Sequence, residues 1–125
     1  KEITVPATIK NIEPRAFMGC VAAKITLDAP IIELEEETFK DCTRLTEIKL
    51  PNTLAVMKPR AFQGCTHILS IDLPDSIRNI RPGVFNSVNA NLKLKLSKDL
   101  VIAGKVAIPV QGDEGLFFKK SIEWK

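Results

Sequence analysis

A repeat of about 23 residues is the feature that most constrains how this chain can fold. Four phenylalanines follow one another at steps of 22, 23 and 23 residues, and three cysteines keep the same step, with Val88 in the fourth place. These residues are Phe17, Phe39, Phe62 and Phe85, and Cys20, Cys42 and Cys65. Self-similarity at a fixed period of this length indicates stacked copies of one small structural unit. The fold of the chain therefore follows from the structure of one repeat and the way the repeats stack.

Each repeat opens with a short alternation of apolar and polar residues, as at 48–50 (Ile-Lys-Leu) and 71–73 (Ile-Asp-Leu). Such alternation predicts a strand with its apolar side chains facing the core. Pro51 and Pro74 follow directly, at a strand end where a missing amide hydrogen costs little. We therefore expect one parallel ladder in sequence order, made of strands 2–6, 24–28, 47–51, 70–74 and 93–97.

A second segment of each repeat has the features of a helix start and stop. The sequence Pro-Arg-Ala-Phe occurs at 14–17 and again at 59–62, and proline is favoured in the first turn of a helix. Residues that suit or tolerate a left-handed stop come next, at Gly19, Asp41 and Gly64, whereas Ser87 departs from this pattern. We therefore predict about one helical turn per repeat.

A strand and a helical turn cannot bury their apolar face alone, but stacked copies can, which predicts a solenoid. The spacing Leu45-x-x-Ile48-x-Leu50 fits the leucine-rich pattern. The stretch 61–74, from Ala-Phe-Gln-Gly-Cys to Ile-Asp-Leu-Pro, resembles the consensus A-F-x-G-C-x-x-L-x-x-I-x-L-P of the bacterial BspA-like leucine-rich repeat family. The resemblance covers about residues 3–97. It implies an α/β solenoid with a parallel strand ladder and short helical turns on its convex side.

The repeat pattern ends after Leu96, which divides the chain into two expected units. Residues 1–97 form an array of about four repeats with five ladder strands. Residues 98–125 contain two apolar stretches around the turn sequence 111–115 (Gln-Gly-Asp-Glu-Gly) and predict a C-terminal β cap of two strands. The N-terminal strand has no cap before it, and a bare edge strand invites association. We therefore expect a fragment of a longer array, with self-association through this edge.

Charge and hydropathy exclude two classes of partner. The net charge of +3 comes entirely from residues 93–125, because residues 1–92 hold 11 basic and 11 acidic side chains. Nucleic-acid-binding proteins gather basic residues on one face, so no nucleic acid is expected. No run of 18 apolar residues exists, so no transmembrane segment is predicted.

The residue types that usually carry chemistry are sparse. The three cysteines have neither a disulfide framework nor a Cys-x-x-Cys pair for zinc, and are expected to be reduced core residues. His67, the single histidine, is expected on the rim without a partner for general-base catalysis. The acidic run 35–37 lacks the spacing of a calcium loop and is expected to be a solvated helix start. Its charges are offset by Lys58, Arg60 and Arg81 in the following repeats. The sequence therefore predicts no catalytic residue, no metal, no cofactor and no enzymatic activity.

The outward positions of the strands form two columns in which opposite charges alternate. The candidate binding face consists of Thr26, Glu47, Lys49, Ser70, Asp72, Lys93 and Lys95. Facing opposite charges stabilise a sheet, so one interpretation is a surface that complements itself. Solenoids also bind partners along the concave surface, so the other interpretation is a mixed-charge recognition face.

The family resemblance supplies the expected function. Proteins of this kind are mostly secreted or surface-attached and are implicated in adhesion and in binding host or other proteins. We therefore expect a non-enzymatic module of a secreted or cell-surface protein that binds a protein or glycan ligand. The alternative is an architectural spacer that holds another domain away from a surface. Binding of a partner by this piece alone would separate the two.

Overall fold

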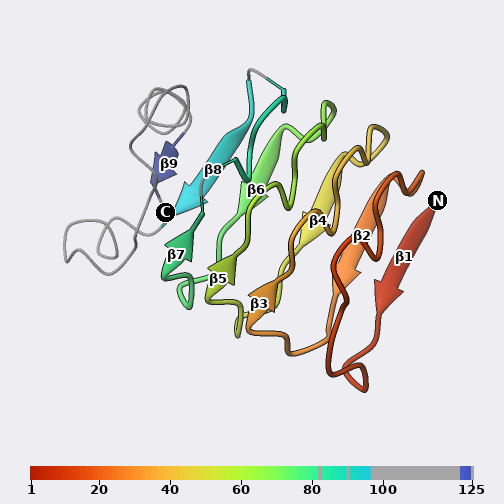
Figure 1. Ribbon diagram of the computed structural model, residues 1–125. Coiled ribbons are helices and arrows are strands. Elements are labelled where there is room, and N and C mark those ends of the chain that lie inside the picture. The colour runs from red at the N-terminus through yellow and green to blue at the C-terminus, as the bar shows by residue number, and fades with distance from the viewer. Residues whose placement is uncertain (82, 90, 97–121, 125) are drawn as a thin grey trace.

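A computed structural model describes residues 1–81, 83–89, 91–96 and 122–124. Its described strands are short, and two rows of parallel strands run along the array from the N-terminus (Figure 1). The bounds of the strands in the first row are β1 (Glu2–Val5), β2 (Lys24–Leu27), β4 (Glu47–Lys49), β6 (Ser70–Asp72), β8 (Lys93–Leu96) and β9 (Ile122–Trp124). Those in the second row are β3 (Glu33–Leu34), β5 (Val56–Met57) and β7 (Asn79–Ile80).

The first row confirms the parallel strands that the alternation predicts. Ile3 of β1 pairs with Ile25 of β2, and Ile25 pairs with Ile48 of β4, so the register follows the repeat step. The predicted single ladder is wrong in its continuity, because this row divides between β4 and β6 into two hydrogen-bonded sheets, β1-β2-β4 and β6-β8-β9. The strand β9 lies in the segment predicted as the cap and pairs in parallel with β8. The rest of the predicted cap lies outside the described residues, and self-association through β1 stays a prediction.

The second row is made of two-residue strands that the sequence pattern did not predict. Leu34 pairs with Met57, and Met57 with Ile80, again at the repeat step. These apolar residues are buried, so their side chains belong to the core. Hydroxyl groups reinforce the stacking near this row. Thr53 Oγ1 donates to the Ile31 carbonyl at 2.7 Å, and Ser76 Oγ donates to the equivalent Leu54 carbonyl at 2.6 Å.

The predicted α/β class and its helical turns are wrong, because the described residues form a solenoid of parallel strands and turns and contain no helix. Each repeat instead has a turn with a left-handed residue near each end. The later ones are Gly19, Asp41, Gly64 and Ser87, with φ from 57° to 82°, so the predicted left-handed stop is present in every repeat. The earlier ones are Arg15, Glu37, Arg60 and Gly83, with φ from 58° to 82°. A left-handed residue at the earlier position interrupts the right-handed run that a helix needs.

The backbone of these turns bonds to the next repeat, and this explains why no helix forms. The Phe17 amide donates to the Thr38 carbonyl at 3.0 Å, and the Phe39 amide donates to the Ala61 carbonyl at 2.9 Å. In a helix the same amides would be bonded within their own turn. Hydrogen bonds between neighbouring repeats therefore hold the turns as well as the strands.

The aligned phenylalanines form one stack beneath the turns, with ring centroids 5.6, 5.4 and 5.9 Å apart along the series. Phe39 and Phe62 are fully buried. The Cys42 and Cys65 thiols are free and each donates to the carbonyl of the phenylalanine in the preceding repeat, with sulfur to oxygen distances of 3.0 Å. The neighbouring Cys42 thiol, and then burial, raise the pKa of Cys65. Such a thiol is poorly reactive and acts as a packing residue.

Candidate functional site

The strands of the first row bring all seven predicted binding residues onto one surface, which we call the strand face. Thr26 lies in β2, Glu47 and Lys49 in β4, Ser70 and Asp72 in β6, and Lys93 and Lys95 in β8. Thr26 pairs with Lys49, Ser70 with Lys93, and Asp72 with Lys95. The charged residues of the two columns therefore lie next to one another on paired strands.

A groove of about 600 Å³ crosses the strand face where the first row divides between β4 and β6. We call it the strand-face groove. Its lining residues are Thr46, Glu47, Ile48, Lys49, Leu50, Leu69, Ser70, Asp72 and Pro74. Four of the seven predicted residues line it, namely Glu47, Lys49, Ser70 and Asp72. Thr26, Lys93 and Lys95 lie on strands to either side and do not line it.

The packing beneath the groove fixes the position of its polar side chains. Ile48 and Ile71, which alternate with the lining residues, are 5% and 1% exposed, so β4 and β6 are anchored in the core. Leu73 is likewise buried just after β6. Side chains that project from strands held in this way lose little freedom when they meet a partner, which lowers the cost of association.

The ion pairs on the strand face leave part of its charge available. Lys24 and Glu47 lie 3.5 Å apart between adjacent strands, and Lys95 and Glu123 lie 3.9 Å apart. Lys49 makes no ion pair with a described residue. The interpretation of a surface that complements itself therefore holds for Glu47 but does not account for Lys49.

The apolar margin of the groove was not predicted from the sequence. Leu69 lines it and is 56% exposed, whereas the equivalent residues in the two preceding repeats are Ala23 and Thr46. The change from Ala23 and Thr46 to leucine was the available signal, but the following repeat carries a buried leucine at the same position, Leu92, so residue type alone did not mark Leu69 as exposed. Pro74, predicted only as the end of a strand, is the second apolar residue at the margin.

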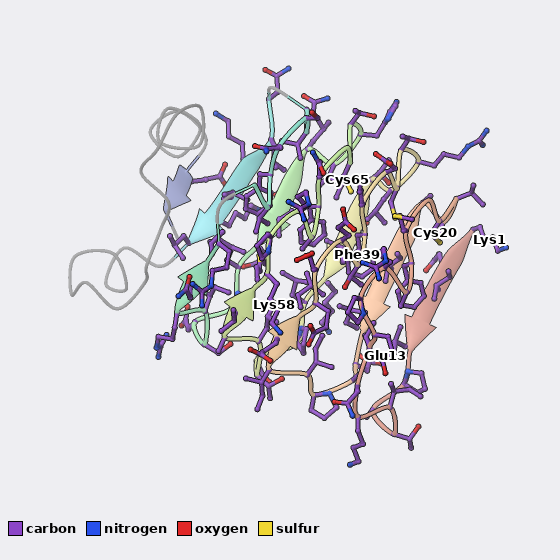
Figure 2. All side chains as sticks on the ribbon, viewed as in Figure 1. Lys1, Glu13, Cys20, Phe39, Lys58 and Cys65 are labelled. Carbon is purple, nitrogen blue, oxygen red and sulfur yellow. The ribbon has the colours of Figure 1, made fainter. Side chains whose placement is uncertain are left out.

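The acidic run 35–37 belongs to a different surface, formed by the turns at 14–19, 36–41 and 59–64, which we call the turn face. The Lys58 amine lies 3.0 Å from Glu35, and Arg60 lies 3.3 Å from both Glu36 and Glu37. The predicted offset of charge between repeats is confirmed for Lys58 and Arg60, and the predicted helix start is wrong. Figure 2 labels Lys58 on the β5 side of the array, apart from the first row of strands.

The turn-face ion pairs also shift the titration of two groups. Burial opposes ionisation of Glu37, but Lys40 and Arg60 outweigh it and leave the pKa of Glu37 below its ordinary value. The Glu35 carboxylate raises the pKa of Lys58 against the opposing effect of burial. Both shifts favour the charged forms that make the pairs, so these charges stabilise the fold.

The residues outside the strand face and the turn face include the single histidine, His67. His67 is exposed, as predicted, with Nδ1 3.1 Å from the Thr66 hydroxyl. Among the described residues no cluster of three or more His, Cys, Asp or Glu side chains could hold a metal ion. No helix there is long and apolar enough to cross a membrane.

Comparison with solved structures supports the fold. The chain superposes on a leucine-rich cell surface protein from Faecalibacterium prausnitzii A2-165 with a TM-score of 0.77 at 20% identity, covering 99% of this chain and 32% of that one. It matches the leucine-rich repeat protein of T. pallidum with a TM-score of 0.59 at 22% identity, over 76% of this chain and 58% of that one. The chain thus spans less than two thirds of either structure. No curated protein sequence matches it.

A match to a family model shows the family to which the chain belongs. The model described as BspA type leucine-rich repeat region, with 6 copies, matches residues 1–105. That stretch contains the phenylalanine and cysteine columns, the described part of both strand rows apart from β9, and the strand-face groove. With its parallel strands paired at the repeat step, the chain belongs to the BspA type leucine-rich repeat family.

Proposed function

We propose that this chain is a non-enzymatic recognition module of a secreted or cell-surface protein, and that it binds a protein partner at the strand-face groove. The observation that carries the proposal is the groove itself, because it gathers Glu47, Lys49, Ser70 and Asp72 in one open depression. The surface location is supported by the similar structure from F. prausnitzii, which is described as a cell surface protein.

The chemistry of the groove favours a protein over a glycan. Glu47 and Asp72 are acidic and Lys49 is basic, so a complementary ligand has to carry both signs of charge. Protein surfaces do, whereas an acidic glycan carries one sign and a neutral glycan carries none. Leu69 adds an exposed apolar side chain at the margin, and contacts of that kind contribute most when they become buried in an interface.

The test is an exchange of charge within the groove. An array of purified extracellular proteins and glycans is first screened with the chain to find a ligand. The variant Lys49→Glu with Asp72→Lys keeps the net charge but inverts the pattern that a partner meets. We expect it to bind the protein ligand on the order of tenfold or more weakly, and circular dichroism should show that the variant keeps the fold of the parent.

A matched exchange elsewhere serves as the control. Lys10 and Asp75 are both exposed and lie outside the groove, so Lys10→Glu with Asp75→Lys should bind like the parent. Equal binding by parent and groove variant would place the site on another surface. A chain that binds nothing on the array would support the architectural spacer, and a ligand found only among the glycans would overturn the choice of a protein.

A further inference from the structure

A second hollow, of about 920 Å³, lies on the rim of the array and is chemically unlike the groove. We call it the rim hollow. It is lined by Lys1, Val21, Ala23, Thr43, Arg44 and His67. These residues precede β1, β2, β4 and β6, so they lie along the edge at which those strands begin (Figure 1). Figure 2 labels Lys1 at this edge, next to the start of β1.

The lining of the rim hollow carries basic side chains and no carboxylate from the described residues. Lys1 and Arg44 form no ion pair within the described part of the chain. Every basic residue of the turn-face network, by contrast, has an acidic partner within 3.6 Å. The cations of the rim are therefore not neutralised by any described residue, and the positive potential they create can attract an anion.

The donors around the hollow suit an oxyanion. Arg44 offers a planar fork of N–H groups that can bond two oxygens of a carboxylate or sulfate at once. When the Thr66 hydroxyl donates to Nδ1 of His67, the neutral ring carries its proton on Nε2 and can donate from that nitrogen. Thr43 adds a hydroxyl to the lining. Three side chains from two successive repeats thus supply donors of different geometry to one site.

The shape and lining of the hollow argue against other polyanions. Single-stranded nucleic acid is held by several aromatic side chains on which successive bases stack, whereas the lining has no Phe, Tyr or Trp and its one aromatic ring is the imidazole of His67. Anionic membranes are bound by clusters of 4–8 Lys or Arg on a surface, whereas this site offers two and a histidine within a concave space. Its volume lies within the range of pockets that hold small ligands, which suits one or two sugar units.

We propose that the rim hollow binds the sulfate or carboxylate groups of an acidic polysaccharide, as a site separate from the strand-face groove. The array would then recognise two partners on two surfaces: a protein with mixed charges on the strand face and an acidic glycan on the rim. The rim site does not depend on the groove, so either proposal can fail while the other stands.

The test measures binding of the chain to immobilised heparin, a sulfated polysaccharide, and to hyaluronan, which carries carboxylates alone. Arg44→Glu should weaken heparin binding by on the order of tenfold or more, and His67→Gln should weaken it less. Hyaluronan bound at comparable affinity assigns the site to carboxylates, and heparin alone assigns it to sulfate esters. Arg44 and His67 are exposed, so both variants should keep the parent's melting temperature.

Lys10→Glu is the matched control, since it makes the same change of net charge at an exposed residue outside both the rim hollow and the strand-face groove. It should retain heparin binding within about twofold, because screened charges outside the hollow contribute little at moderate salt. If Lys10→Glu and Arg44→Glu weaken binding equally, the attraction is one of net charge and the rim site is refuted. Equal binding of single-stranded DNA or polyglutamate, or no binding of either polysaccharide, overturns the proposal as well.

Discussion

The turn face and the strand face are built from the same repeat, yet they use their charges differently. On the turn face, Glu33 and the acidic run 35–37 pair with Arg15, Lys40, Lys58 and Arg60 across three successive repeats. On the strand face, Lys24 pairs with Glu47 and Lys95 with Glu123, and Lys49 has no ion pair with a described residue. The turn-face charges are therefore paired within the molecule, whereas some of the strand-face charges are exposed to solvent.

This difference indicates which surface is available for recognition. A charge that is already paired must lose its partner before it can bind another, so the turn-face network resists a ligand. Isolated pairs on an exposed surface stabilise a fold only slightly, and a network that links three repeats is better placed to do so. Substitutions on the two faces can therefore separate the residues that stabilise the fold from those available to bind a partner.

The largest effect should come from the phenylalanine stack that underlies the turn face. Phe62 is fully buried between the rings of Phe39 and Phe85. Phe62→Ala should lower the free energy of unfolding by about 3–5 kcal/mol, measured by chemical denaturation. Phe62→Leu, which keeps most of the apolar volume, should cost much less. A Phe62→Ala chain as stable as the parent would mean that the phenylalanine stack does not stabilise the turn face.

The next effect concerns the left-handed residues that end the turns. Gly64 has a φ of 82°, and a Cβ there would meet the Asp41 carboxylate and lie 3.3 Å from the Asp41 Cα. Gly19 has a φ of 72° with open space around it. Gly19→Ala should cost about 1–2 kcal/mol, the penalty of a side chain in this conformation. Gly64→Ala should cost more, because the neighbouring turn must also move. Equal losses in denaturation would show that the turns are not tightly stacked.

The turns also show how far the sequence could predict this fold. The steps between Phe17, Phe39 and Phe62 predicted the repeat and the register, because stacking requires equivalent residues to meet. The left-handed conformation of Gly19 and Gly64 was predicted from residue type. The helical turn was predicted wrongly, since a proline followed by a glycine suits a helical turn and a pair of tight turns equally. What decides between them is the hydrogen bond from each phenylalanine amide to the next repeat, and that partner is distant in sequence.

The binding surfaces were predictable in part for a similar reason. Alternation in the strands placed Glu47, Lys49, Ser70 and Asp72 outwards, and β4 and β6 present them so. The groove depends on where the row of strands divides, and no local pattern marks that point. The two-residue strands of the second row are too short for an alternation to be recognised. The rim hollow combines residues from four repeats, so it emerges only when the repeats are stacked.

A smaller effect should follow from the turn-face ion pairs, and it should depend on pH. The pKa of Glu37 is lowered in the folded chain, so its pairs stabilise the fold above the unfolded pKa of about 4.3. That contribution is lost as the pH falls through the lower folded pKa. Glu37→Gln should therefore melt at a lower temperature than the parent at neutral pH, and the gap should close in acid. A gap that stays constant below pH ~4 would mean that Glu37 acts through packing rather than charge.

The smallest effect on stability should come from the strand face. Lys49 is exposed and has no acidic partner among the described residues, so Lys49→Glu should change the free energy of unfolding by less than about 0.5 kcal/mol. Arg60→Glu makes the same change of charge on the turn face, where Arg60 meets Glu36 and Glu37 at 3.3 Å. Glu37 itself holds the equivalent left-handed position in the preceding repeat, so a glutamate is compatible with the backbone there. Arg60→Glu should consequently destabilise the fold through charge alone, and its effect should shrink as salt is added. If denaturation shows the two reversals to be equally harmless, the turn-face network contributes nothing to the fold, and the turn face becomes as plausible a binding surface as the strand face.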